Sequence, residues 1–210
     1  EEDQKEFFQR LQEGLPLTSS EKLNSVHSKL RDYCLNLAKH NVFFSKTSIA
    51  NKRYAYFDIC AKCAAIEIEG IDTGLRYEDI KSIFEANNNF SSSSAVAKRL
   101  KLSLDLLQKH LPKIDGDIKN RTLAQSIITL TAHLLKNGLK ESTFTTLATF
   151  IAFFVEELSR QVELGRDATD DDYLEFQSTV NANTKKGARI RLTVMLKKLF
   201  ARYPAYFDDF

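Results

Sequence analysis

The chain has 210 residues, a formal net charge of +2 at pH 7, and hydrophobic and charged shares of 43% and 28%. This length is enough to bury a sizeable core, either in one large domain or in two small ones. The chain contains only 7 glycines and 3 prolines, which argues against the many turns of an all-β architecture. A net charge this close to zero indicates no particular partner, so a nucleic-acid interface would have to come from local clusters of basic residues.

Three features of the sequence bear on the cellular compartment of the protein. No apolar run approaches the roughly 18 residues that a membrane-spanning helix needs, so we expect no membrane partner. The first residues are acidic and lack the basic and apolar regions of a signal peptide. Cysteine occurs 3 times, an odd number that argues against a disulfide framework and favours reduced thiols. We therefore expect a cytoplasmic protein.

Apolar residues recur at helical spacing along nearly the whole chain. Thr18 and Glu21 have the spacing of a capping box, and Gly70 and Gly165 are typical residues to end a helix. The expected helices cover residues 19–40, 51–69 and 78–86, a segment from the serines at 91–94 to Pro112, a segment ending at 137–138, residues 142–164, a short helix capped by Thr169, and residues 187–203. Strands are nearly absent from this pattern. The predicted fold is all-α, an irregular multi-helix bundle of about eight or nine helices.

The chain shows one weak internal boundary. Asp115, Gly116 and Asp117 predict a tight turn, which marks a weak sub-boundary near residues 115–118. The helices after this turn carry an apolar face that is too wide to remain exposed, so we expect both sides to pack together. We therefore predict a single helical domain over residues 1–210.

The opening stretch, residues 7–24, contains the pattern F-x-R-L-Q-x-G-x-P-L-T-x-x-E-x-L-N. It resembles a stretch in restriction and phage-defence proteins of the GmrS-like (GmrSD-type) family. Looser similarity continues through residues 51–54, through 98–100 and 120–121, and through 187–191. In that family a ParB-like, sulfiredoxin-like catalytic domain comes first and a helical region follows.

The resemblance implies that this chain is the helical companion of such a catalytic domain. The family uses a D-G-Q-Q-R-type motif for nucleotide hydrolysis or nuclease activity. That motif does not occur in this sequence, so we carry over no catalytic residue and expect the catalytic part to be missing upstream. A helical companion would shape the active cleft, assist homo-oligomerisation or contact DNA. The implied partners are a ParB-like domain or chain, DNA and a second copy of this chain.

A run of basic residues without an intervening acid accompanies a broad apolar helix face near the C-terminus. Its members are Lys185, Lys186, Arg189, Arg191, Lys197, Lys198 and Arg202. Such a helix could lie along a phosphate backbone, where each contact releases counterions. The alternative is the solvated face of an ordinary amphipathic helix, partnered by the acids at positions 167–175 just upstream.

A second basic group, Asn51, Lys52 and Arg53, precedes Tyr54 at a predicted helix start. The N-terminus of a helix together with lysine and arginine can bind an anion. The alternative is an ordinary first turn, in which Asn51 caps the helix and Tyr54 packs on the core.

No motif brings together residues for catalysis or for metal binding. Cys60 and Cys63 form a C-x-x-C, but a zinc site would need two further ligands, and helix packing by two small apolar residues is the simpler interpretation. The 4 histidines are scattered, and no phosphate-binding loop or nucleophile elbow occurs. We therefore expect no metal, no cofactor and no catalytic residue in this chain.

Three hypotheses about function follow. The first is a non-catalytic helical scaffold of a GmrS-like DNA restriction or phage-defence protein, which contacts DNA or the companion domain. The second is a helical protein-interaction or oligomerisation module with no nucleic-acid role, which would explain the 15 Phe and 7 Tyr if several are exposed. The third is a free-standing enzyme with an unfamiliar site.

Overall fold

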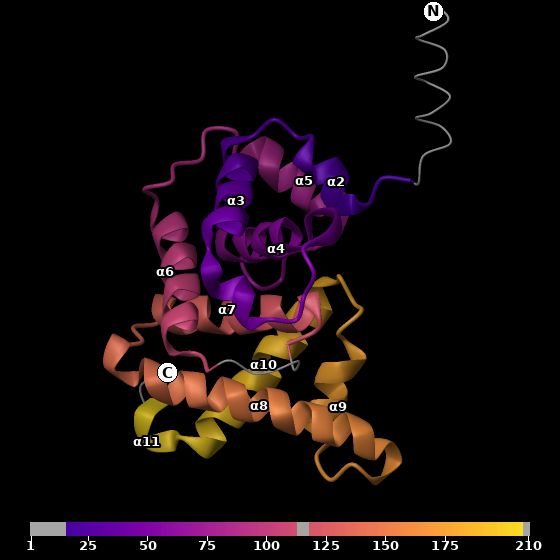
Figure 1. The fold of residues 1–210 in the computed structure, drawn as a ribbon, viewed down its shortest axis with the longest axis vertical. Helices are drawn as coiled ribbons and strands as arrows, with labels where there is room; N and C mark the ends of the chain where they lie inside the picture. The colour runs from indigo at the N-terminus through magenta and orange to yellow at the C-terminus, as the bar shows by residue number, and fades with distance from the viewer. Residues whose placement is uncertain (1–15, 113–117, 208–210) are drawn as a thin grey trace, which may run out of the picture.

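A computed structural model describes residues 16–112 and 118–207, except for the side chain of Lys185 (Figure 1). The described residues contain no strand and 10 α-helices, of which 8 have seven or more residues, and the structure is 75% helical. The predicted all-α, multi-helix fold is confirmed. No helix in the two described segments is both long enough and apolar enough to cross a membrane.

The two described segments contain the following helices. The first contains α2 (Ser19–Asn24), α3 (Lys29–His40), η1 (Val42–Lys46), η2 (Lys52–Tyr54), α4 (Ala55–Glu69), α5 (Tyr77–Ala86) and α6 (Ala95–His110), where η denotes a 3-10 helix. The second contains α7 (Arg121–Lys136), η3 (Glu141–Thr143), α8 (Phe144–Leu164), η4 (Gly165–Asp167), α9 (Asp171–Ser178), α10 (Lys185–Arg202) and α11 (Pro204–Phe207).

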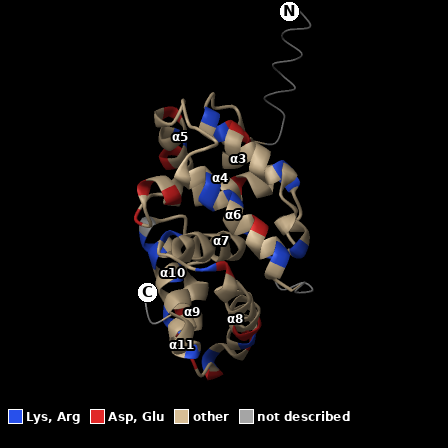
Figure 2. Cartoon of the chain, turned by 90° about the vertical axis from the view of Figure 1, so that its left-hand side faces the viewer, with Lys and Arg blue, Asp and Glu red and all other residues tan. Residues whose placement is uncertain are grey.

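Helix α7 lies in the middle of the molecule, between α3–α6 and α8–α11 (Figure 1). It packs against α4 and α6 and against α10. Between Arg121 and Lys136 it contains no charged residue, and Figure 2 shows it almost free of charge among helices that carry both signs. Every residue from 123 to 132 is buried. A helix that is apolar or neutral on all sides is expected in the centre of a bundle, and α7 occupies that place.

One continuous hydrophobic core includes helices from both described segments. In the second segment aromatic rings fill its centre, where Phe154 contacts Phe150, Tyr173 and Phe176 at centroid separations of 5.7, 5.0 and 5.2 Å. The turn predicted at residues 115–117 lies outside the described residues. Ile118, which follows it, is fully buried in the same core.

Several predicted helix ends are confirmed. Thr18 and Glu21 form the capping box, since the Thr18 hydroxyl accepts from the Glu21 N–H at 3.3 Å and the Glu21 carboxylate accepts from the Thr18 N–H at 2.8 Å. Gly70 ends α4 with a φ of +94°, which glycine adopts without steric cost. Ser94 caps α6 by accepting a hydrogen bond from the Ala97 N–H at 3.2 Å.

Other boundaries differ from the prediction. The helix expected over residues 19–40 is two helices, because the Ser28 side chain caps α3 by accepting from the Leu30 N–H at 3.2 Å. The same hydroxyl donates to the Asn87 carbonyl at 3.3 Å, so a distant segment helps to fix the break. Asp170 caps α9 in place of Thr169, because the Thr169 hydroxyl accepts a hydrogen bond from a side chain of α8 instead.

Candidate functional site

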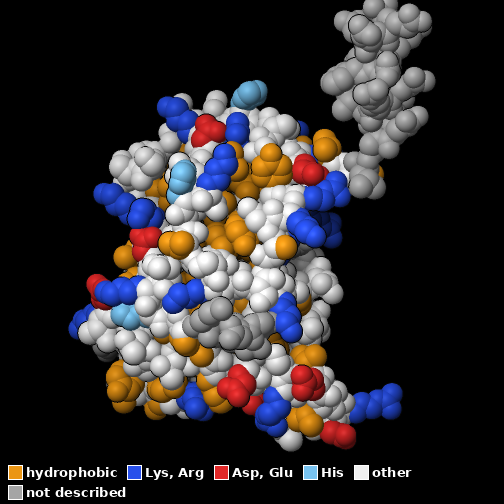
Figure 3. Space-filling view, in the orientation of Figure 1, with side chains coloured by type: hydrophobic (Ala, Val, Ile, Leu, Met, Phe, Trp, Pro, Cys, Tyr) orange, Lys and Arg blue, Asp and Glu red, His pale blue; other side chains and the backbone are white. Residues whose placement is uncertain are grey.

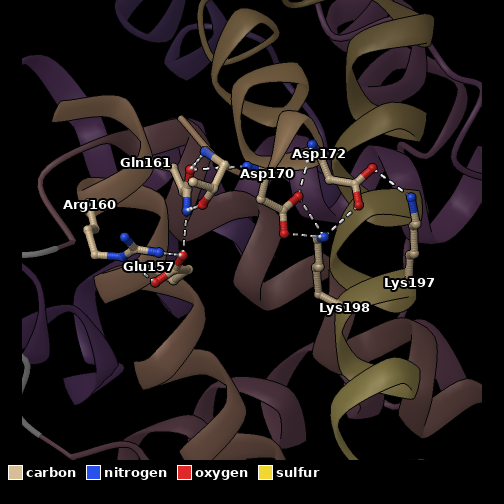
Figure 4. Close-up of polar contacts among 8 residues, drawn as sticks. Glu157, Arg160, Gln161, Asp170, Asp172, Lys197 and Lys198 are labelled. Atoms are coloured by element: carbon tan, nitrogen blue, oxygen red, sulfur yellow. Dashed lines mark hydrogen bonds and ion pairs between the residues drawn. The ribbon is translucent and has the colours of Figure 1, made fainter. Parts of the chain in front are cut away.

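The C-terminal basic run lies on α10, and the N-terminal end of α9 places acidic side chains against it (Figure 4). The Lys198 Nζ lies 2.6 Å from Asp170 Oδ2 and 2.6 Å from Asp172 Oδ2, and the Lys197 Nζ lies 2.8 Å from Asp172 Oδ1. On the face seen in Figure 3, basic side chains are likewise interspersed with acidic and apolar ones. The acids upstream of the run therefore neutralise two of its lysines.

The ionisation of this network follows from its hydrogen bonds. The bond from Lys197, followed by the bond from Lys198, lowers the pKa of Asp172. Partial burial lowers the pKa of Lys198, but its hydrogen bonds to Asp170 and Asp172 outweigh that effect and the net pKa is raised. Asp172 and Lys198 consequently remain charged and paired at neutral pH.

The C-terminal part of α8 holds the acids of α9 in place (Figure 4). Glu157 accepts hydrogen bonds from Arg160 Nη2 and Gln161 Nε2 at 2.5 and 2.7 Å. Gln161 is fully buried, and its Oε1 accepts from the backbone N–H groups of Thr169 and Asp170 at 2.9 and 3.3 Å. The buried amide therefore fixes the loop before α9, and with it the acidic cap that meets α10.

Two arginines of the run are exposed but also have protein contacts. The Arg189 Nε donates to Asp72 Oδ1 at 2.6 Å, which ties α10 to the loop between α4 and α5, although the Arg189 side chain remains 60% exposed. The Arg202 guanidinium lies over the Phe153 ring, 3.6 Å from its centroid. Such stacking holds the side chain but leaves its charge available.

The first turn of α10 carries the remaining lysines. Lys186 is exposed and forms no ion pair within the described part of the chain. Lys185 begins α10, but its side chain lies outside the described residues. The cationic surface left for a phosphate backbone is therefore narrower than the sequence predicted.

Arg191 corrects the sequence prediction, because it is only 1% exposed and cannot contact DNA. Its Nη1 donates to the Thr179 carbonyl at 2.6 Å, and its Nε donates to the Ser126 hydroxyl at 3.1 Å. The Ala182 carbonyl lies 3.5 Å from the same Nη1. The guanidinium therefore pins the C-terminal end of α9 and the turn after it to α7. The partial negative charge of a helix C-terminus favours a cation at this position.

No carboxylate of the described residues forms an ion pair with Arg191, and its Nη2 has no hydrogen-bond partner. Burial lowers the pKa of Arg191 to about 10, so the group is still charged at neutral pH. Gly187 permits the close approach of the turn, since a Cβ there would lie 2.9 Å from the Ala182 carbonyl oxygen and 3.2 Å from Arg191 Nη1. Arg191 is therefore a structural residue.

Asn51, Lys52 and Arg53 do not open a helix as predicted. Asn51 precedes the 3-10 helix η2, which contains Lys52 and Arg53, and α4 begins only after η2. Asn51 still satisfies an N–H of the first turn of α4, since its Oδ1 accepts from the Tyr56 N–H at 3.1 Å. Lys52 is exposed. The group therefore does not form the predicted anion site at a helix N-terminus.

Arg53 instead forms a contact that we call the clasp, made by Pro16, Glu21 and Arg53. The Arg53 Nε donates to Glu21 Oε2 at 3.0 Å, and its Nη2 donates to the Pro16 carbonyl at 2.7 Å. The hydrogen bond from Arg53, followed by those from Thr18, lowers the pKa of Glu21 to about 2. The Glu21 carboxylate therefore takes the place of an external anion.

The backbone beside the clasp is left-handed at two successive residues, with φ of +52° at Arg53 and +62° at Tyr54. For residues other than glycine this conformation costs roughly 1–2 kcal/mol each and persists only where contacts hold it. The Tyr54 ring packs edge-on against Phe57 at a centroid separation of 6.3 Å, yet Tyr54 is 41% exposed. Leu17, next to Pro16, is 60% exposed. We call the clasp together with these two exposed apolar side chains the clasp corner.

The remaining chemical candidates are in the core. The C-x-x-C residues Cys60 and Cys63 are buried beside Cys34, which confirms that this motif packs α4 against its neighbours. Burial raises the pKa of the Cys63 thiol to about 12. Across residues 16–112 and 118–207, no group of three or more His, Cys, Asp or Glu side chains could hold a metal ion.

A buried ion pair within α4 was not predicted from the sequence. Asp58 is 6% exposed, and its Oδ2 accepts a hydrogen bond from Lys62 Nζ at 2.9 Å. Both residues line a cavity of about 150 Å³ between α2, α4, α5 and the loop before α10. The available signal was an acid and a base four residues apart on an otherwise apolar helix.

Comparison with known proteins adds no relative from which a function could be transferred. No protein-family model matches the chain, and no curated protein and no solved structure matches it. The GmrS-like relationship is therefore a proposal that rests on the sequence pattern of residues 7–24.

Proposed function

We propose that this protein is a non-catalytic helical scaffold that binds another protein, a ParB-like companion domain or chain, at the clasp corner. The observation that carries the proposal is the pair Leu17 and Tyr54, which are 60% and 41% exposed and directly follow two members of the clasp, Pro16 and Arg53, in the sequence. Apolar side chains on a preorganised backbone lose little conformational freedom on binding and are effective interface anchors. The left-handed backbone at Tyr54 agrees with this role, since strained residues cluster at binding sites.

The charge distribution favours a protein partner over a nucleic acid. A phosphate backbone placed along the C-terminal half of α10 would have to compete with Asp170 and Asp172 for Lys197 and Lys198. The same carboxylates would repel the phosphates. Affinity for a duplex is greatest where unpaired protein cations displace the counterions condensed on the DNA. Binding through the clasp corner requires none of these ion pairs to break.

Calorimetry and sizing chromatography with a GmrS-type ParB-like domain test the proposal. We expect a complex, and we expect Leu17→Asp and Tyr54→Ser each to weaken it about tenfold or more, because each removes an apolar anchor. Leu102→Asp is the matched control, since Leu102 is 46% exposed but lies on α6. Circular dichroism should show the same helix content for all three variants.

The outcomes separate the two protein-binding hypotheses. Absence of a complex, or a complex that Leu17→Asp and Tyr54→Ser leave unchanged, contradicts the companion-scaffold proposal. A dimer of this chain that is insensitive to salt and is dissociated by the same variants would instead favour the oligomerisation module.

Contact with DNA is a second candidate, favoured only by the exposed cations Lys186, Arg189 and Arg202. If Lys186 touches a phosphate, Lys186→Gln should reduce the slope of log affinity against log salt by about 0.9. Lys198→Gln is the control, because Lys198 is held by two carboxylates. A chain that binds no duplex at low salt excludes this candidate.

A further inference from the structure

The cavity beside the Asp58–Lys62 pair has no role in the scaffold proposed above. Its volume of about 150 Å³ is enough to hold several waters. Pockets for drug-sized ligands are larger, roughly 300–1,000 Å³. The size of this cavity therefore favours a compact metabolite over a nucleotide.

One part of the cavity wall is charged and has unused hydrogen-bonding capacity. The Lys62 ammonium bonds to one oxygen of Asp58, and no described group donates to the other oxygen. An ammonium has three N–H donors, so Lys62 can donate a hydrogen bond to a further partner while it stays bonded to Asp58. Arg76 also lines the cavity and forms no ion pair with a described residue. A nearly buried polar group with spare capacity is completed by water or by a ligand.

Another part of the wall is aliphatic. It is formed by Leu23, Leu75 and Ile80, which are buried at 1%, 1% and 0% exposure. Water inside the cavity would satisfy the charged part but would face these side chains without partners. A molecule with a charged end and a short aliphatic part would match both parts of the wall.

The wall is held in shape by the loop between α4 and α5. A Cβ at Gly74 would overlap the Asp79 carboxylate, so glycine allows this carboxylate to reach back and accept the Arg76 N–H at 3.0 Å. The ion pair between Asp72 and Arg189 ties the same loop to α10. The backbone of the loop that carries Leu75 and Arg76 is therefore fixed without a ligand, which lowers the entropic cost of binding one.

We propose that this cavity binds a free α-amino acid with a small aliphatic side chain. The ligand ammonium donates to the open oxygen of Asp58, and the ligand carboxylate accepts from Lys62 and Arg76. The aliphatic side chain of the ligand packs on the wall that α2 and α5 provide. Charges then alternate in sign around the site, so each buried charge keeps an opposite neighbour when the ligand enters.

Isothermal titration calorimetry of the whole chain with free alanine, valine and leucine tests the proposal. Ligand concentrations up to about 10 mM cover dissociation constants in the millimolar range. We expect at least one of the three to bind. Acetate and methylammonium, which each carry only one of the two charges, should not bind detectably under the same conditions.

Variants at the rim connect the binding to this cavity. Asp58→Asn would leave Lys62 buried without its partner and so destabilise the fold, which makes it unsuitable. Arg76→Gln removes one charge-assisted contact and should weaken binding about tenfold. Ser19→Phe, at an exposed lining residue, should fill the cavity and abolish binding. Lys81→Gln, on α5 but outside the cavity lining, is the matched control.

Three results would overturn the proposal. The first is that none of the three amino acids binds the folded chain. The second is that binding survives unchanged in both Arg76→Gln and Ser19→Phe. The third is that acetate binds as tightly as the amino acids, which would reduce the site to a simple anion site. None of these results depends on whether the clasp corner binds a companion protein.

Discussion

Replacing Arg191 tests whether the C-terminal basic run is a binding surface or partly a framework. The guanidinium donates to the Thr179 carbonyl at 2.6 Å and to the Ser126 hydroxyl at 3.1 Å, and the residue is 1% exposed. Arg191→Ala removes both hydrogen bonds and leaves the carbonyl at the end of α9 without this donor. It also opens a cavity where the long side chain had packed, so the α9–α10 turn loses its attachment to α7.

The expected size of the effect follows from two opposing contributions. A hydrogen bond to a charged group contributes about 1.5–3 kcal/mol, and a buried acceptor left unpaired costs about 1–3 kcal/mol. Burial of the charge opposes them, because lowering the pKa of Arg191 from its ordinary 12.5 to about 10 corresponds to about 3 kcal/mol. We expect Arg191→Ala to reduce the free energy of unfolding by about 3 kcal/mol. Arg191→Met fills the same volume without the buried charge and should cost only about 1–2 kcal/mol.

Urea unfolding at pH 7, followed by circular dichroism, measures both values. Ser126→Ala removes only the weaker acceptor and should cost about 1 kcal/mol. The double variant with Arg191→Met should then be less destabilised than the sum of the single variants, since the two side chains share one hydrogen bond. If Arg191→Ala leaves the urea midpoint unchanged but removes affinity for DNA, the structural role is refuted.

Three further predictions concern other parts of the fold. Gly187→Ala should lower the thermal unfolding temperature, because its Cβ would lie 2.9 Å from the Ala182 carbonyl oxygen. This is expected although alanine is more favourable than glycine in a helix by about 1 kcal/mol. A higher unfolding temperature would contradict this packing. Glu21→Gln should be less stable than the wild type at neutral pH, and the difference should shrink as pH falls from 4.5 towards 2, because Arg53 lowers the pKa of Glu21 to about 2 and the stabilisation is lost on protonation. Urea unfolding at several pH values checks this, and a difference independent of pH would argue against the clasp. The three thiols should react with a thiol reagent only after unfolding, because they are buried and the pKa of Cys63 is raised to about 12; rapid reaction of the native protein would show that this core is open.

The elements of this fold could be predicted because their signals are local. Helical spacing of apolar residues, the Thr18–Glu21 capping box and the glycine after α4 each act within a few residues of one another. The uncharged stretch of α7 likewise indicates burial on all sides before any neighbour is known. The all-α class and most helix positions are therefore properties of the sequence alone.

The fate of each charged side chain depends on tertiary structure instead. Arg189 and Arg191 are two residues apart in the same basic run, yet one remains largely exposed and the other is buried against Ser126, 65 residues away in the chain. The burial of the Asp58–Lys62 pair beside a cavity similarly required α2, α5 and a distant loop to close around α4. Whether a cation is a binding group or a structural one is decided by burial and by the nearest acceptor. Both depend on contacts between segments that are far apart in the chain, and a local sequence pattern does not specify those contacts.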